Sequence, residues 1–300
     1  MTVIVSMLTA SGPIATLSLP SATCRKLNRP FGLWGSFRNA TASGSVLNAP
    51  STAMGNVAGY RRAWIDAADY GRRWDDYRAK EGRGEKADPP KRDLQLETLA
   101  GVLKGEILVQ NHCYRADEMA TMLDVAKEFG YKITAFHHAL ESYKIADVLK
   151  ANDICTATWA NWWGSKLEAW DSVEANVPLV AAAGACAVIK SDDPDVTQRL
   201  NQEAAEALAA GRAAGLTITE ADAISWITAN PAKMLGILSQ TGTLESGKRA
   251  DLGIWDHSPF SVYARTEKVF IDGGLAYDRR NPAYQPKSDF ELGQIAMEAR

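Results

Sequence analysis

Short apolar segments alternate with helical segments through the middle of the chain, and this alternation restricts the folds open to it. Four apolar segments are expected to be strands: EILVQNH (106–112), KITAFHH (132–138), DICTATW (153–159) and ACAVIKSD (185–192). Each is followed by a segment of helical periodicity, and Gly130 ends the first of these helices. Short, continuously apolar strands separated by helices are typical of a parallel sheet covered by helices. The sequence therefore predicts an α/β fold.

The segments before this region differ in character. The first fifty residues show no clean periodicity and are expected to be irregular. A strongly charged, aromatic helix is predicted from about Tyr60 until glycines and prolines break it before Arg92, and a short helix from Leu94 to Lys104. A helix is also expected from Lys166 to Ala183.

The segments after the strands predict two helices and a small β unit. In TITEADAISWITANPAKMLGI, Thr219 with Asp222 three residues later is a plausible N-cap, and Pro231 is expected to open the second helix. The tail alternates in short strands, with a hairpin at 272–274 (Asp-Gly-Gly). We divide the chain into an irregular or degenerate region (1–93), a β/α region (94–240) and a small β unit with its tail (241–300).

Composition excludes several classes of function. The 300 residues, 46% of them hydrophobic, suffice for one α/β barrel or two smaller domains. The net charge is -3 and no basic block occurs, which argues against a nucleic-acid surface. No segment is apolar enough to span a membrane, and the start lacks the basic region of a secretory signal. The compartment stays open, with the cytoplasm slightly favoured over the periplasm.

The four cysteines are widely spaced and include no CxxC pair. They resemble neither a disulfide framework nor a zinc knuckle. Three of them, Cys113, Cys155 and Cys186, lie in apolar segments and are expected to be small buried core residues.

Three of the four predicted strands end in side chains that bind metals. The first ends in His112, the second in His137 and His138, and the fourth in Asp192 and Asp193. In a β/α barrel, the carboxyl ends of the strands converge on one mouth. Two imidazoles and a carboxylate there predict a site for a borderline divalent ion such as zinc.

Each of these residues also has a structural interpretation. A single histidine after a strand is more often a hydrogen-bonded loop residue, and an Asp-Asp-Pro sequence before a helix is an N-cap signature. We expect at least one of the two aspartates to be a cap. The tryptophans after the third strand either line a substrate pocket or pack a loop over the rim: Trp159, Trp162, Trp163 and Trp170.

Six segments of the chain together resemble a known family. They are ILVQNHCYRADEM, ITAFHHALESYKIAD, TATWANWWGSK, SDDPDVTQRLNQEAA, TANPAKMLGI and the tail GTLESGKRADLGIWDHSPFSVYARTEKVFIDGGLAYDR. They look like the C-terminal half of metal-dependent amidohydrolases, in the imidazolonepropionase-like and dipeptidase-like branch. The resemblance runs from about Leu94 to Arg280. It implies a distorted (β/α)8 TIM-type barrel, partial in this chain, with a small C-terminal β unit.

The resemblance also implies roles for individual residues. His112 matches the metal histidine of the fifth barrel strand, and His138 that of the sixth. Asp192 matches the eighth-strand aspartate, which binds metal and serves as general base. Tyr114 and Arg115 stand where similar proteins hold substrate groups, and His137 is assigned to the substrate with them. Lys190 stands where such proteins often carry a histidine.

The sequence departs from the family pattern at its start. Similar proteins carry His-x-His on the first barrel strand, whereas this chain has no histidine before His112. We therefore expect a truncated barrel with two open sheet edges and an uncovered apolar interior. Such a chain should need a partner, a swapped copy or a rearranged N-terminal segment, and a homo-oligomer is expected.

The predicted function is hydrolysis of carbon–nitrogen bonds other than linear peptide bonds, in a small amide, cyclic amide or dipeptide-like substrate. A divalent metal, expected to be zinc, would activate water, with Asp192 as general base and His138 assisting catalysis. The alternative is an inactive remnant that acts as an oligomeric binding or scaffold protein. A metal-dependent aldolase is a weaker alternative, because the tail is typical of amidohydrolases.

Overall fold

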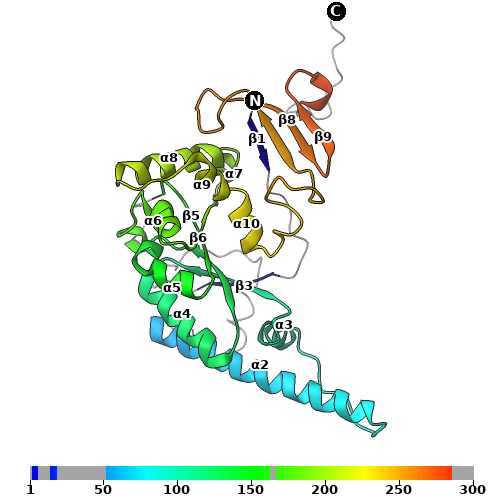
Figure 1. Ribbon diagram of the computed structural model, residues 1–300. Coiled ribbons are helices and arrows are strands. Elements are labelled where there is room, and N and C mark those ends of the chain that lie inside the picture. The colour runs from blue at the N-terminus through cyan, green and yellow to red at the C-terminus, as the bar shows by residue number, and fades with distance from the viewer. Residues whose placement is uncertain (1, 6–13, 19–51, 163–166, 286–300) are drawn as a thin grey trace, which may run out of the picture.

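The molecule has three parts along its length (Figure 1). The computed structural model describes residues 2–5, 14–18, 52–162 and 167–285. A long helix lies at one end, a parallel sheet with its helices in the middle, and a small antiparallel sheet at the other end.

The central sheet has five parallel strands in the order β2-β3-β4-β5-β6. Their bounds are β2 Ile14–Ser18, β3 Leu108–Cys113, β4 Ile133–His138, β5 Cys155–Thr158 and β6 Cys186–Ile189. The four predicted strands are thus confirmed, as is the α/β class. Among the described strands the sheet ends at β2 and β6, so it does not close into a barrel.

Helices connect and cover these strands. The α-helices are α2 Ala53–Gly82, α3 Leu94–Leu103, α4 Ala116–Phe129, α5 Ala146–Ala151, α6 Asn176–Ala182, α7 Pro194–Thr197, α8 Leu200–Ala213, α9 Glu220–Ser225 and α10 Ala229–Met234. Short 3-10 helices are η1 Ser142–Ile145, η2 Leu167–Ala169 and η3 Pro282–Tyr284. The predicted capping box of Thr219 and Asp222 opens α9 and is confirmed.

Two helices differ from the sequence prediction. Helix α2 begins at Ala53, well before Tyr60, because Thr52 caps it by accepting a hydrogen bond from the amide of Gly55. The region before residue 93 therefore contains a 30-residue helix, besides strands β1 and β2, and is not irregular throughout. The helix expected from Lys166 is instead the short α6, and Pro178 is tolerated there because it lies in the first turn.

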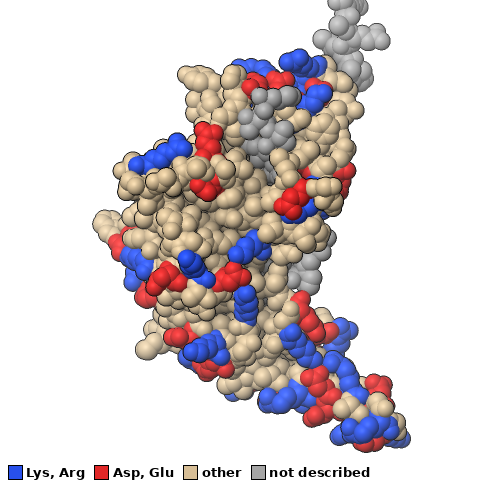
Figure 2. Space-filling view, in the orientation of Figure 1, with Lys and Arg blue, Asp and Glu red and all other residues tan. Residues whose placement is uncertain are grey.

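The end of α2 that points away from the sheet is solvated, as its composition predicts. Figure 2 shows basic and acidic side chains interleaved at this protruding end. Neighbouring turns are paired, for example Arg78 with Asp75 at 3.0 Å, and Lys104 of the next helical segment joins the same carboxylate at 2.8 Å. The opposite end of α2 is buried at Tyr60 and Trp64, and Trp64 stacks against Tyr131 with ring centroids 4.3 Å apart.

Helix α10 covers part of the sheet face on which a complete barrel would have its interior. Met234 packs in one cluster with Ala135, Cys155, Ala157 and Val188 from three strands. Its carbonyl accepts a hydrogen bond from the side-chain amide of Gln110, at 3.2 Å. The apolar interior expected to be uncovered is therefore partly filled by the chain itself.

The chain itself engages the β6 edge of the sheet and covers the edge of β3. At β6, the amide of Ile189 donates to the carbonyl of Trp226 (3.0 Å), and the side chain of Asn230 donates to the carbonyl of Ala187 (2.8 Å). On the other side, β2 from the N-terminal region pairs with β3 and is itself the edge strand there. A strand from the N-terminal region thus covers β3, while the expected partner, swapped copy or rearranged N-terminal segment stays a prediction.

The small sheet has the order β1-β7-β8-β9, with all neighbours antiparallel. Its strands are β1 Thr2–Val5, β7 Leu252–Trp255, β8 Thr266–Ile271 and β9 Gly274–Asp278. The hairpin predicted at 272–274 is confirmed, and both of its turn residues have positive φ, Asp272 at 51° and Gly273 at 79°. The three-domain division of the chain stays a prediction.

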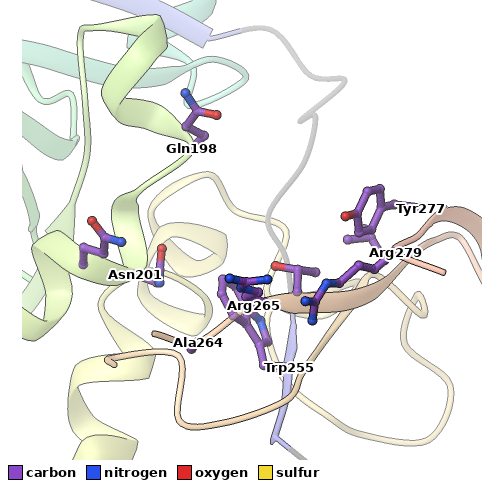
Figure 3. A pocket seen from close by; sticks show the side chains of 10 residues that line it. Gln198, Asn201, Trp255, Ala264, Arg265, Tyr277 and Arg279 are labelled. Carbon is purple, nitrogen blue, oxygen red and sulfur yellow. The ribbon is translucent and has the colours of Figure 1, made fainter. Parts of the chain in front are cut away.

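A pocket of about 520 Å³ lies between α7–α8 and the small sheet (Figure 3). Trp255, Arg265, Tyr277 and Arg279 line it on the sheet side. The guanidinium of Arg279 is balanced by Glu267, at 2.7 Å. None of the predicted site residues lines this pocket.

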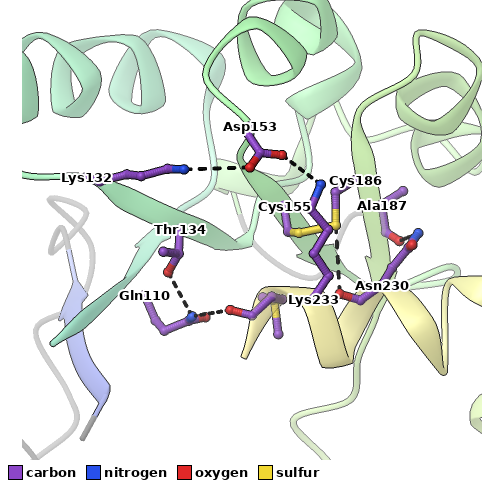
Figure 4. Close-up of a disulfide and its surroundings, with 10 residues drawn as sticks. Gln110, Lys132, Thr134, Asp153, Cys155, Cys186, Ala187, Asn230 and Lys233 are labelled. Carbon is purple, nitrogen blue, oxygen red and sulfur yellow. Dashed lines mark hydrogen bonds and ion pairs between the residues drawn. A yellow bond between two sulfur atoms is a disulfide. The ribbon is translucent and has the colours of Figure 1, made fainter. Parts of the chain in front are cut away.

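Cys155 and Cys186 form a disulfide, which corrects the prediction of unpaired cysteines (Figure 4). They stand opposite each other on β5 and β6 with Cα atoms 4.4 Å apart. The sequence separation of 31 residues gives no local motif, so only the strand register brings the two sulfur atoms together. Cys113 is buried with a free thiol, as predicted.

Within the described residues, no helix combines the length and apolar character needed to cross a bilayer. The expected homo-oligomeric state and the slight preference for the cytoplasm stay predictions.

Candidate active site

Two histidines lie side by side on adjacent strands at the carboxyl end of the parallel sheet. His112 of β3 is the register partner of His137 of β4. Their rings stack with centroids 4.9 Å apart and an interplanar angle of 13°. Nε2 of His137 lies 2.8 Å from Oε1 of Gln110, on the same face of β3. Gln110 therefore fixes the ring of His137, and His137 in turn supports His112.

His138 joins this pair because the backbone turns sharply at the end of β4. Its φ is 69°, and that of the next residue, Ala139, is 29°. Residues other than glycine seldom adopt positive φ, and such strain concentrates at functional sites. The turn directs the ring back toward β3, where its Nε2 lies 2.8 Å from Nδ1 of His112. The structure thus brings all three predicted histidines together.

Neighbouring elements hold this turn in place. The amide of Ala139 donates to the carbonyl of Cys113 (2.8 Å), and the carbonyl of Ala139 accepts from the side chain of Asn176 (3.0 Å). The buried carboxylate of Glu141 accepts from the amide of Ala116 at the start of α4 (3.0 Å). These hydrogen bonds to backbone groups stabilise the strained conformation.

Aromatic side chains surround His138. Tyr114 stacks on its ring at 4.6 Å and Trp159 at 4.8 Å between centroids, and Trp162 stacks on Trp159 at 5.2 Å. Trp159 and Trp162 therefore line the site, whereas Trp170 is exposed and Trp163 lies outside the described residues. Arg115 lies at the start of α4, where its guanidinium donates to Asp117 at 3.0 Å. The substrate roles of Tyr114 and Arg115 stay predictions.

The predicted carboxylate reaches the histidines from the end of β6. Oδ2 of Asp192 lies 3.4 Å from Nδ1 of His138. Its other oxygen, Oδ1, accepts from the ammonium of Lys190 at 2.5 Å. Asp193 is the N-cap of α7 and accepts from the amide of Asp195. One of the two aspartates is therefore a cap, as expected, and Asp192 is the one that faces the site.

The electrostatics of the site favour neutral imidazoles. Burial lowers the pKa of His112 to about 4, and the nearby Lys190 charge adds to this, while Asp192 opposes it. Burial lowers the pKa of His137 to about 3, with further contributions from His112 and Lys190. A neutral imidazole has a lone pair that can accept a proton or bind a metal.

The side chains fit a divalent metal in chemical type, but they are not yet arranged around one. The imidazoles of His112 and His138 and the carboxylate of Asp192 are side chains of the kinds that bind zinc. However, two imidazole nitrogens on one tetrahedral zinc ion stand about 3.4 Å apart, whereas here the nearest ring nitrogens of the two histidines are 2.8 Å apart. In the described part of the chain, no three His, Cys, Asp or Glu side chains are grouped as a metal site. The metal roles of these residues stay a prediction.

Sequence reasoning missed several supporting residues. Gln110, Asn176 and Glu141 contact the site only through tertiary structure, and nothing in their local sequence marks them. Lys190 differs from the histidine common in similar proteins, and this departure was the one signal available for it. Its ammonium lies 4.2 Å from the ring centroid of Trp159 as well as beside Asp192, which places it inside the site.

Comparison with known proteins gives a consistent assignment. The sequence model of the amidohydrolase family matches residues 107–276. The amidohydrolase tasK of Hapsidospora irregularis is 30% identical over 243 residues, which are 78% of this chain and 24% of that protein. An imidazolonepropionase of Mesorhizobium japonicum is 52% identical over 42 residues, 14% of this chain and 10% of that protein.

A solved structure agrees with the sequence matches. The crystal structure of an amidohydrolase from Thermotoga maritima MSB8 superposes with a TM-score of 0.68 at 29% identity, over 77% of this chain and 58% of that one. The chain thus spans less than two thirds of the length of each of these relatives. The family model matches more than half of this chain, and it includes the strands that carry the three histidines and Asp192. The chain belongs to the amidohydrolase family.

Proposed function

We propose that this chain hydrolyses carbon–nitrogen bonds other than linear peptide bonds, in a small amide, cyclic amide or dipeptide-like substrate. The observation that carries the proposal is the contact of Asp192 with His138 and of His138 with His112, at the carboxyl ends of three parallel strands. Family membership supports the reaction class. The partial sheet is proposed to correspond to the later strands of a (β/α)8 barrel.

Asp192 is proposed as the general base. About half of its side chain is exposed, so a water molecule can reach it, and it can accept the proton that water loses when it attacks the substrate carbon. His138 would assist catalysis by holding this carboxylate in position through its contact with Oδ2. Its support by His112 and its two aromatic neighbours fixes the ring position, which lowers the reorganisation needed during reaction.

A divalent ion, proposed to be zinc, would be held by His112, His138 and Asp192. When bound, it would supply Lewis-acid polarisation and would favour ionised water at neutral pH. His137 is proposed to remain with Gln110 and to help shape the substrate side of the site. Tyr114 and Trp162, which are only partly buried, are proposed to offer aromatic surface against which a planar amide or ring could pack, whereas Trp159 is buried against His138 and Trp162.

The proposal is tested by incubating the zinc-treated protein with dipeptides, cyclic imides and imidazolones and measuring release of amine or ring opening. We expect hydrolysis of at least one class. Asp192→Asn should lower kcat/KM by at least about 100-fold, the usual minimum contribution of a general base. Asp193→Asn is the matched control, because asparagine is an equally good N-cap, and it should retain activity.

The opposite results would overturn the proposal. Hydrolysis that is equal in wild type and Asp192→Asn would remove the assigned base. No hydrolysis of any of the three classes would instead favour a binding or scaffold role for this chain.

A further inference from the structure

Lys190 places a positive charge beside Asp192, one of the proposed metal ligands. It is the last residue before the loop that carries Asp192, directly after β6 ends at Ile189. Only 13% of its side chain is exposed. Its ammonium donates to Oδ1 of Asp192 at 2.5 Å and lies 4.2 Å from the ring centroid of Trp159. The charge is therefore held on two sides, by a carboxylate and by an aromatic face.

The same ammonium also acts on the two stacked histidines of the site. The positive charge of Lys190 contributes to the low pKa of His112 and of His137. Electrostatic interactions between partly buried charges are screened less than those at the surface. A second cation placed between His112, His138 and Asp192 would meet this charge at short range, and it would share the carboxylate that already balances the charge of Lys190.

We propose that Lys190 and a divalent cation compete for the carboxylate of Asp192, so that the ion binds only when the ammonium releases it. This inference rests on the proposed function, because it takes His112, His138 and Asp192 as the ligands of that ion. Lys190 is then a positioning residue. The Lys190 ammonium balances the charge of the Asp192 carboxylate before the ion binds. Replacing Lys190 with a neutral residue should therefore raise the affinity for the metal.

The competition accounts for the present geometry of the site. With Oδ1 of Asp192 held by Lys190, only Oδ2 faces His138, at 3.4 Å from Nδ1. The other nitrogen of His138 is directed to His112. The three side chains are therefore linked in a row instead of converging on a point, and release of the ammonium is the first change that lets the carboxylate turn toward the histidines.

The experiment measures Zn²⁺ affinity by competition with a chromogenic chelator in the full chain. We expect Lys190→Met to bind Zn²⁺ at least about tenfold more tightly than wild type, since every tenfold change corresponds to about 1.4 kcal/mol. Lys190→Arg keeps the charge and should stay within about threefold of wild type. Lys233→Met is the matched control, because Lys233 forms a comparable ion pair with Asp153, at 2.7 Å, away from the site.

A double-mutant cycle separates competition for Asp192 from general charge repulsion. In an Asp192→Asn background, Lys190→Met should change Zn²⁺ affinity by less than about threefold, because the shared carboxylate is gone. An equal gain in both backgrounds would overturn the proposal, as would equal affinities of wild type and Lys190→Met. In either case the proposed metal ligands would stand. Failure of every variant to bind Zn²⁺ would overturn the proposed metal centre, and the competition with it.

Discussion

Nδ1 of His112 and Nε2 of His138 lie 2.8 Å apart, although the two residues are 26 positions apart in the sequence. One of the two rings must donate and the other accept, so this bond forms only when at least one imidazole is neutral. A metal ion bound to both nitrogens would replace this hydrogen bond. The contact therefore marks the place where metal binding would change the structure most directly.

The first prediction concerns this pair. Wild-type protein is expected to hold close to one zinc ion per chain after zinc loading and dialysis, and His138→Ala should lose it, because too few ligands remain. Zinc content is measured by elemental analysis. His257→Ala is the control, since His257 is a largely exposed histidine of the small β unit and its loss should leave the content unchanged. Equal zinc in wild type and His138→Ala would exclude His138 as a ligand.

The second prediction concerns the disulfide between β5 and β6. Because it closes a long loop of the unfolded chain, breaking it should cost about 2–4 kcal/mol of unfolding free energy. Urea denaturation with and without reductant measures the difference, and thiol titration confirms reduction. A Cys155→Ala/Cys186→Ala double variant should be less stable than wild type and insensitive to reductant. A fully reduced wild-type protein of unchanged stability would contradict the prediction.

The parallel sheet could be predicted because its strands carry a local signal. Each is a short apolar segment followed by a helix, and the hairpin at 272–274 has glycine where positive φ is needed. The start of α2 and the shortness of α6 depend on a cap at Thr52 and on Pro178, features that act on only one turn. The strand β2 could not be predicted, since its pairing with β3 depends on the open edge of the sheet and not on its own periodicity.

The site could be predicted only in part, because some of its contacts depend on tertiary structure and have no local signal in the sequence. His112, His138 and Asp192 each end a predicted strand, so the parallel fold alone brings their tips together. Histidine is among the residues enriched at positive φ, but this preference does not distinguish His138 from His137. The pairing of Cys155 with Cys186 and of Lys190 with Asp192 depends on strand register and side-chain direction. Neither property can be read from spacing along the chain.

The third prediction compares two helical glycines. A Cβ added to Gly211 of α8 would lie 2.6 Å from Cδ1 of Ile218 and 2.6 Å from Cβ of Pro178. Gly211→Ala should therefore destabilise the protein by about 1–3 kcal/mol, through overpacking, even though alanine is the better helix former.

Gly59 of α2 is the matched control for that substitution. A Cβ there would meet nothing within 4 Å, so Gly59→Ala should raise the unfolding free energy by about 0.5–1 kcal/mol through helix propensity alone. Urea denaturation of both variants provides the test. If Gly211→Ala were as stabilising as Gly59→Ala, the close packing of α8 against Pro178 and Ile218 would be wrong.

The fourth prediction concerns the buried carboxyl of Glu203 on α8. Its Oε2 accepts from the amide of Ala160, next to Trp159 of the site, at 3.1 Å. Its Oε1 is buried without a hydrogen-bond partner among the described residues. Burial is the main cause that raises the pKa of this carboxyl, since the ionised form is poorly solvated there. The folded protein therefore holds the Glu203 proton to higher pH than the unfolded chain does.

This difference fixes the sign of a pH effect on stability. Between the ordinary glutamate pKa, about 4.3, and the raised pKa of Glu203, the folded state binds more protons than the unfolded state, so the unfolding free energy falls as pH rises. Glu203→Gln cannot ionise and should lack this contribution, so its stability relative to wild type should increase from pH 4 to pH 8. Urea denaturation across this range measures both proteins, and parallel curves for wild type and Glu203→Gln would show that the carboxyl titrates alike in the folded and unfolded states.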